Sequence, residues 1–250
     1  MALFSLLVTE AENATLIERT RPMKLKHFVL FAICLGFGNV FAQETDQQAV
    51  EEAWGHLEKG KSGFKETWVN PSFNATKYQN LYLWEAAFQY RDVGPAQRSR
   101  MTMMNTRQQE FGISEEGRKE FEAVVSEIFV AELNKAKKFN VVEQIGPNTL
   151  IMRAAVIDIV SNVPPDLVGR GDVYLSNIGE ATLVLELMDA DDGEIVAVVA
   201  ERQRIQAGTG RIDSFSVPAN RATVMTEVRR WAKRAANKLR KELDKAIAKG

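Results

Sequence analysis

The sequence predicts an α/β (α+β) fold, in which a mostly antiparallel sheet of about four to five strands is backed by two long helices and preceded by an amino-terminal arm. Three features carry this prediction: two segments with helical spacing of apolar residues, a β-hairpin signal between them, and a nearly continuous apolar run before the hairpin. We expect the arm at residues 43–62 and a single domain at 63–248.

The arm begins with a predicted short helix at 46–57, where apolar residues recur at spacings of three and four, and the glycines at 60 and 63 end it. Residues 64–71 are expected to be extended, because the residue before a proline disfavours helix. The aromatic and apolar segment 81–88 predicts the first strand of the domain, although its length also fits a helical turn or two.

The first long helix is predicted to run from a cap at Ser114 to about residue 137. Glu115 and Glu116 fall in its first turn, where the helix dipole favours acidic side chains. Its apolar stripe comprises Phe121, Val124, Val125, Ile128, Phe129 and Leu133. A short strand is expected at 139–144, and the run 149–160 is apolar enough for a central strand covered on both faces.

The clearest local signal is a hairpin formed by residues 172–188 and 194–206 around a turn that ends at Gly193. Glycine suits this position because the common closures require a left-handed backbone. The second long helix is predicted at 219–248. Its apolar stripe comprises Val224, Val228, Trp231, Ala235, Leu239, Leu243 and Ile247.

Residues 23–42 match a cleavable secretory signal peptide, with Lys24 and Lys26 ahead of an apolar run at 28–38 and cleavage between Ala42 and Gln43. The run is shorter than the roughly 20 residues that span a bilayer. A buried helix is the alternative, although two glycines in the run would weaken it. We therefore expect an exported bacterial protein, periplasmic or secreted, with peripheral attachment to the outer membrane left open.

Several expectations follow from this signal peptide. Residues 1–22 fit no signal-peptide plan, so translation is expected to start at Met23. Cys34 follows Ile33 rather than a small residue, which argues against a lipid anchor. Cleavage would remove the only cysteine and leave His56 as the only histidine, so no thiol chemistry is expected in the mature chain. Its net charge near −2 argues against nucleic-acid binding.

Three segments carry a family resemblance: Trp68-Val-Asn-Pro71 with Tyr78, residues 179–189, and residues 193–199. Through them the chain resembles, from about Gly63 to Lys241, a family of bacterial envelope proteins known as the domain of unknown function numbered 3313. The resemblance implies a secreted or lipid-anchored protein whose motifs contain no catalytic residues. The order of elements is also similar to nucleotide-binding-like domains of envelope assembly factors, including curli secretion and penicillin-binding-protein activator lipoproteins, which assemble or touch partners.

The last helix carries a large excess of basic residues, which predicts a contact surface for an envelope protein or an anionic envelope component. The candidate contact residues are Arg229, Arg230, Lys233, Arg234, Lys238, Arg240 and Lys241. A solvated outer face of a helix that covers a sheet is the alternative. The sheet edge and the segment 91–110 are further candidate contact regions.

Two sets of residues have features of ligand-binding sites, but a turn or a loop explains each of them better. Asp189, Asp191, Asp192 and Glu194 supply oxygen atoms, yet they lack the spacing of a calcium-binding loop and suit a hairpin turn. The glycines at 208 and 210 lack the lysine and hydroxyl residue of a phosphate-binding loop. We expect no cofactor and no metal.

Carboxylates offer the alternative function, a hydrolase or small-ligand-binding protein of the periplasm built on Asp158, Asp189 and Asp213. Asp158 interrupts an apolar strand near Arg153, so it is either a buried acid with a raised pKa or the partner of an arginine. His56 has no predicted nucleophile beside it. A non-enzymatic binding or assembly module is favoured, because the mature chain lacks cysteine and nearly all histidine.

Overall fold

The computed structural model describes residues 54–93, 110–164, 173–207 and 216–249. The chain divides into two compact units, Met1–Gly55 and His56–Gly250, and only Trp54 and Gly55 of the first unit are described. The predicted leader, the signal peptide with Ala42 and Gln43, and the arm helix up to residue 53 lie outside the described residues. These three stay predictions.

The second unit is built on a mixed sheet, which has eight strands among the described residues, in the order β1-β2-β9-β8-β6-β3-β5 with β4 also paired to β6. The strands of this sheet are β1 (Glu58–Lys59), β2 (Glu66–Val69), β3 (Asn80–Leu83), β4 (Ala87–Tyr90), β5 (Asn140–Val142), β6 (Thr149–Ser161), β8 (Asn177–Asp189) and β9 (Ile195–Gln206). A separate pair joins β7 (Tyr174–Leu175) to β10 (Val217–Pro218), and a short 3-10 helix, η3, covers Ala75–Lys77.

The mixed α and β architecture with two helices is confirmed, but the sheet has more strands than the four to five expected. The additional strands are two to four residues long, too short to show an alternating pattern. The predicted strand 81–88 is two strands, β3 and β4, which lie one after the other along the same edge of β6. Both are parallel to β6, and β5 is parallel to β3, so this side of the sheet is not antiparallel.

The long strands match their predictions closely. β8 and β9 form the antiparallel hairpin, and β8 also pairs antiparallel with β6. Gly193 has φ +76°, and its amide donates to the Asp189 carbonyl at 3.0 Å. The hairpin begins later than expected, at Asn177, because Tyr174 and Leu175 pair with β10 instead.

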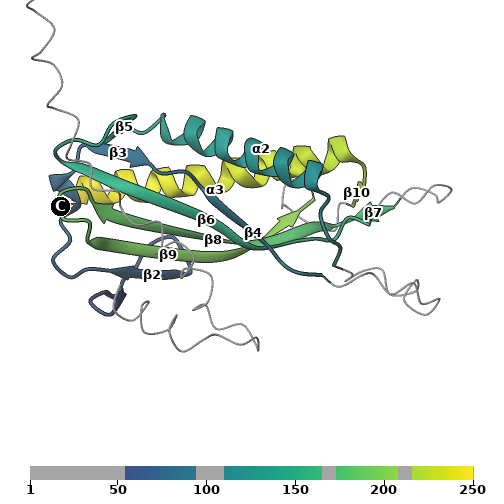
Figure 1. Ribbon diagram of the computed structural model, residues 1–250, viewed down its shortest axis with the longest axis horizontal. Coiled ribbons are helices and arrows are strands. Elements are labelled where there is room, and N and C mark those ends of the chain that lie inside the picture. Colours follow the sequence, from purple (N-terminus) through teal and green to yellow (C-terminus); the bar gives the residue numbers. More distant parts are fainter. Residues whose placement is uncertain (1–53, 94–109, 165–172, 208–215, 250) are drawn as a thin grey trace, which may run out of the picture. The chain divides into compact units, whose positions relative to one another are not determined.

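Two helices, α2 (Glu115–Leu133) and α3 (Arg221–Lys249), lie side by side over one face of the sheet (Figure 1). The predicted cap is confirmed, since Ser114 Oγ accepts a bond from the Gly117 amide at 3.2 Å. Arg221, in the first turn of α3, pairs with Glu116 and Glu120 near the start of α2. Asp244, near the end of α3, accepts bonds from two backbone amides just beyond α2. The helices therefore run parallel to each other.

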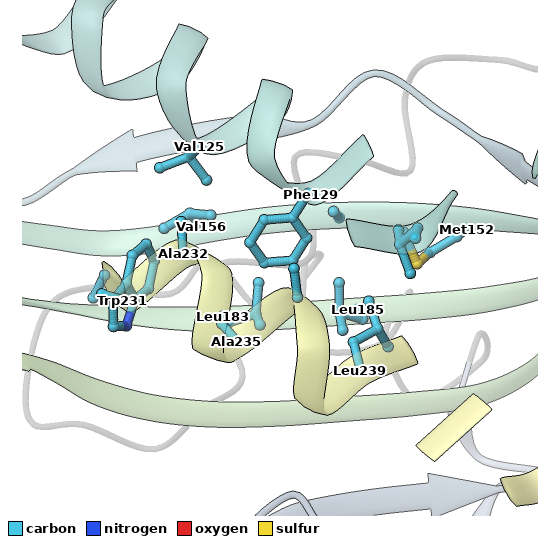
Figure 2. Packing of buried hydrophobic residues seen from close by; sticks show 14 of the residues in the cluster. Val125, Phe129, Met152, Val156, Leu183, Leu185, Trp231, Ala232, Ala235 and Leu239 are labelled. Atoms are coloured by element: carbon cyan, nitrogen blue, oxygen red, sulfur yellow. The ribbon is translucent and has the colours of Figure 1, made fainter. Parts of the chain in front are cut away.

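The main core lies between these helices and the sheet, and Figure 2 shows side chains from both layers converging there. Phe121 of α2 stacks on Trp231 of α3 with ring centroids 6.1 Å apart. Along β6, alternate residues enter this core, while those between them, such as Ile151 and Ala155, are also buried. Burial of both faces explains why 149–160 is nearly continuously apolar.

The alternation along β6 shifts at Asp158, which has φ +54°. The register with β8 is irregular between Ile157 and Val160, as expected for a β-bulge. A left-handed backbone is uncommon for residues other than glycine, although aspartate tolerates it better than most. The bulge therefore sets both the backbone and the environment of the one charged residue near the end of this strand.

Candidate functional site

The buried side of α3 determines which of its residues can meet a partner. Val228, Trp231, Ala235, Leu239 and Leu243 are between 1% and 7% exposed and pack into the core. They follow one another at spacings of three and four, as a helix covering a sheet requires. The opposite side of α3 is thereby left to solvent, and most of its long side chains there are basic.

Five of the seven predicted contact residues are exposed on that outward side. We call this set the cationic face of α3; it comprises Arg229, Arg230, Lys233, Arg234 and Lys241. At 1.5 Å per residue the face extends about 18 Å along the helix. Among the other residues on this side, Thr226 is exposed and Asn237 half-buried, and both are uncharged.

The cationic face is largely without acidic partners. Arg230 donates to Glu227 at 2.5 Å. Within the part of the chain that the structure describes, the other four members make no ion pair: Arg229, Lys233, Arg234 and Lys241. Exposed basic side chains repel one another at this spacing, so the arrangement contributes little to folding.

Lys238 and Arg240 are held within the protein. Lys238 donates to Glu201 of β9 at 2.6 Å and lies 4.7 Å from the centroid of the Phe64 ring. Arg240 donates to Asn237 at 2.7 Å, and its side chain is 15% exposed. Both residues border the buried stripe of α3, so we leave them out of the contact surface.

The cationic face offers charge without apolar surface. The large hydrophobic side chains that are exposed among the described residues are Val130, Ile145, Val173 and Tyr174, and none of them belongs to α3. In the portion of the chain that is described, no helix has the length and apolar character needed to cross a membrane.

Asp158 is the centre of a different charged cluster. Its carboxylate accepts two bonds from Arg91, at 2.7 and 2.6 Å, and one from Arg202 at 2.6 Å. Arg202 also donates to Glu180, which pairs with Arg204 at 3.1 Å. Arg91 pairs in addition with Glu110. We call these six residues the Asp158 network: Arg91, Glu110, Asp158, Glu180, Arg202 and Arg204.

Of the two roles left open for Asp158, the structure shows the partner of an arginine, although that arginine is not Arg153. The Asp158 side chain is 33% exposed, and Arg153 pairs with Glu186 instead. The Arg91 guanidinium, helped by Arg202, holds the pKa of Asp158 below its usual value, although partial burial acts in the opposite direction. Burial raises the pKa of Glu180, but Arg202 and Arg204 outweigh it and lower the net value. Neither carboxyl has the raised pKa of a general acid.

Asp189 belongs to a third cluster, at the closed end of the hairpin. Lys77 donates to it at 2.8 Å and Tyr78 at 2.7 Å, while its other oxygen accepts the Asp191 amide. Burial raises the pKa of Asp189, but Lys77 and these hydrogen bonds bring the net value below normal. Burial, and then the Asp189 carboxylate, raises the pKa of Tyr78. The bonds explain why an acid ends β8.

The described part of the chain does not gather its acids into a joint site. It contains no group of three or more His, Cys, Asp or Glu side chains arranged to hold a metal ion. Asp189 lies opposite Leu150 on β6, and Asp158 is eight residues further along that strand, roughly 25 Å away. Paired catalytic carboxylates lie within about 10 Å of each other. Asp213 and the glycines at 208 and 210 fall outside the described residues.

His56 lies at the other edge of the hairpin. Its Nε2 atom is 2.7 Å from the carbonyl oxygen of Ile195 and 3.5 Å from Glu194. Glu194 also accepts a bond from Asn70 at 2.8 Å. The side chain is 33% exposed, and these contacts attach the segment before β1 to the start of β9. Of the 91–110 contact region, only residues 91–93 and 110 are described.

No protein-family model matches this chain. No curated protein matches it either. The resemblance to the family numbered 3313 therefore stays a prediction.

Solved structures offer distant likenesses. A Xanthomonas campestris protein of the domain-of-unknown-function family numbered 330 is 10% identical, with 71% of this chain and 90% of that chain covered and a TM-score of 0.37. A putative lipoprotein from Caulobacter crescentus is 16% identical, covering 52% and 85%, with a TM-score of 0.33. The PelC dodecamer of Paraburkholderia phytofirmans is 9% identical, covering 70% and 95%, with a TM-score of 0.30. We draw no functional conclusion from likenesses at this level.

Proposed function

We propose that this protein is a non-enzymatic binding module of the bacterial cell envelope, which contacts an anionic partner through the cationic face of α3. One observation carries the proposal: Arg229, Lys233, Arg234 and Lys241 are exposed on one side of one helix and make no ion pair within the described residues. The predicted signal peptide at 23–42 supports export to the envelope.

The two other charged clusters support this choice of surface by contrast. In the Asp158 network and around Asp189, each carboxylate has an arginine or lysine partner, so the charges satisfy one another. Nearby acids pair with other basic residues instead of these four. Glu116 and Glu120 pair with Arg221, and Glu227 pairs with Arg230. Asp244 pairs with Arg240, and Glu242 with Lys245. Charge that the protein does not neutralise attracts counter-charge from outside.

The test is retention on isolated envelopes. Purified mature protein is sedimented with envelope fragments, beside a variant that carries Arg229→Gln, Lys233→Gln, Arg234→Gln and Lys241→Gln, here called the face variant. A matched control removes four exposed lysines elsewhere, with Lys61→Gln, Lys65→Gln, Lys137→Gln and Lys138→Gln. Both variants change the net charge equally.

We expect the wild type and the control to sediment with the envelopes, and the face variant to remain in solution. Raising the salt concentration should release the wild type, because exposed charges are screened beyond about 10 Å at 0.1 M ionic strength. Equal retention of the face variant and the wild type would refute the proposal.

A further inference from the structure

The chemistry of the cationic face narrows the class of anionic partner, and this step rests on the proposed function. Three properties of α3 bear on it: the curvature of the face, the absence of apolar side chains from it, and the spacing of its charges. Each property can be compared with what a protein, a small ligand or a lipid surface requires.

The face is the convex outer side of a single helix, and the described residues of α3 do not form a concave site there. Small anionic ligands are usually bound in concave sites with a few converging polar groups. Here Arg229 and Lys233 lie one turn apart, and Arg234 and Lys241 lie two turns apart, all directed outward. The arrangement suits an extended surface of many anionic groups better than one discrete ligand.

The cationic face also lacks the apolar centre that specific protein–protein interfaces have. Specific protein interfaces have a core from which charged residues are depleted and in which aromatic residues and methionine are enriched. On α3 the large apolar residues are buried in the core of the protein itself, with Trp231 1% and Leu239 3% exposed. No exposed large hydrophobic side chain of the described residues lies on this helix.

The same burial argues against insertion into a membrane. Helices that lie within the membrane interface turn Trp, Phe or Leu towards the acyl chains. In α3 the residues of these types, such as Trp231 and Leu239, are buried against the sheet. A bilayer rich in anionic headgroups is the remaining class of partner, because its phosphates are mobile and can adjust to cations spread over a helix face about 18 Å long.

We propose that the cationic face of α3 docks this protein on the surface of an anionic phospholipid bilayer, by charge alone and without insertion. The headgroup phosphates would contact the side chains of Arg229, Lys233, Arg234 and Lys241. The contact would be reversible and sensitive to salt, as expected for a peripheral protein.

The experiment uses purified mature protein and vesicles of phosphatidylglycerol mixed with phosphatidylethanolamine, beside vesicles of phosphatidylcholine alone. We expect binding to the anionic vesicles only, with release as sodium chloride rises from about 0.05 to about 0.5 M. One basic residue near such a surface contributes about fivefold in affinity. The face variant should therefore bind more than a hundredfold more weakly, and the control with Lys61, Lys65, Lys137 and Lys138 replaced should bind as the wild type does.

Brominated acyl chains provide a second measurement, because they quench tryptophan fluorescence on contact. We expect no quenching when the wild type is bound, since no tryptophan lies on the cationic face. Quenching would overturn docking without insertion. This measurement and the comparison of vesicle compositions use the wild type alone, so both remain decisive if the face variant folds poorly.

Three further results would overturn the inference: wild-type binding to phosphatidylcholine as strong as to the anionic vesicles, undiminished binding of the face variant, or no binding of the wild type to anionic vesicles. If the wild type does not bind the vesicles but still sediments with envelopes, and the face variant does not, the partner is another polyanion. The proposed function then stands and the lipid assignment fails. If envelope retention does not depend on α3, both fail.

Discussion

The cationic face of α3 and the Asp158 network are both rich in arginine, but they differ in whether their charges are paired. In the network, Arg91 and Arg202 each contact two carboxylates, and the residues come from five separate parts of the chain. On α3, four exposed cations follow one another on a single helix, and among the described residues the nearby acids pair with other basic side chains. Paired charges join elements of the fold, whereas unpaired ones on a single element join nothing within the protein.

This difference predicts opposite effects of substitution. Breaking a paired cluster should reduce the free energy of unfolding, because it leaves a partly buried charge without its partner. Neutralising an unpaired cluster should leave the fold unchanged and affect only external contacts. The four predictions below test this contrast, from the largest expected change in stability to the smallest.

The most buried ion pair described, Arg153 with Glu186, should show the largest effect. The two side chains are 14% and 7% exposed. Arg153→Met would leave the Glu186 carboxylate buried without its arginine, which we expect to cost about 3–5 kcal/mol. Urea unfolding at pH 7 measures this change. A loss below about 1 kcal/mol would show that burial does not make this ion pair more important for stability than an exposed one.

The double variant Arg153→Met with Glu186→Leu is the control for that measurement. It removes both charges and replaces them with apolar side chains of similar length, so most of the lost stability should return. If the double variant is as unstable as Arg153→Met alone, the loss comes from packing and not from an unpaired charge.

Asp158→Asn should have an intermediate effect. Asparagine tolerates the left-handed backbone at this position, so the substitution removes the charge and keeps the bulge. We expect a loss of about 1–2 kcal/mol at neutral pH, because hydrogen bonds from Arg91 and Arg202 lose their charged acceptor. Asp191→Asn is a matched control, since Asp191 is 59% exposed and 3.5 Å from Lys77. It should change stability by less than about 0.5 kcal/mol.

The effect of Asp158→Asn should also depend on pH in a defined direction. The pKa of Asp158 is lowered in the folded protein, so its contribution is complete above the unfolded value near 3.9 and is lost as pH falls through the folded value. The stability difference between wild type and variant should therefore shrink below about pH 4. A difference that stays constant or grows in acid would contradict the assigned pairing.

The face variant should show the smallest change in stability. Arg229, Lys233, Arg234 and Lys241 have no ion pair to lose among the described residues, and surface substitutions of this kind usually fall within about 0.5 kcal/mol. Relief of mutual repulsion could even stabilise the helix slightly. Thermal unfolding measures this change. A loss above about 2 kcal/mol would mean that the cationic face serves the fold.

The long elements could be predicted from the sequence, because each is stabilised by a pattern that repeats within it. The α2 and α3 stripes, the 149–160 run and the Gly193 turn are examples. Among the short strands, β5 falls within the strand predicted at 139–144 and β2 within the segment predicted to be extended at 64–71. β1 could not be predicted, since it exists only through its pairing with β2. The division of 81–88 into β3 and β4 also depends on β6, which lies more than sixty residues away.

The candidate site was only partly predictable for a related reason. Helical spacing identified the exposed basic residues, but Lys238 turns inward to Glu201, a partner on β9. Asp158 was expected beside Arg153. Its partners are Arg91, which follows β4, and Arg202 on β9, and both are brought close by strand pairing within the sheet. The bulge at Asp158 shifts which residues of β6 point to each face of the sheet, and no local sequence pattern predicts it. Charge partners across a sheet become visible only once the register is known.

Lysine footprinting on isolated envelopes tests the central claim most directly. Acetylation of the bound and the free wild type compares Lys233 and Lys241, on the cationic face, with Lys61 and Lys65, which are exposed elsewhere. Our account predicts protection of Lys233 and Lys241 in the bound state and unchanged labelling of Lys61 and Lys65. Equal labelling of all four lysines, or protection confined to Lys61 and Lys65, would contradict it.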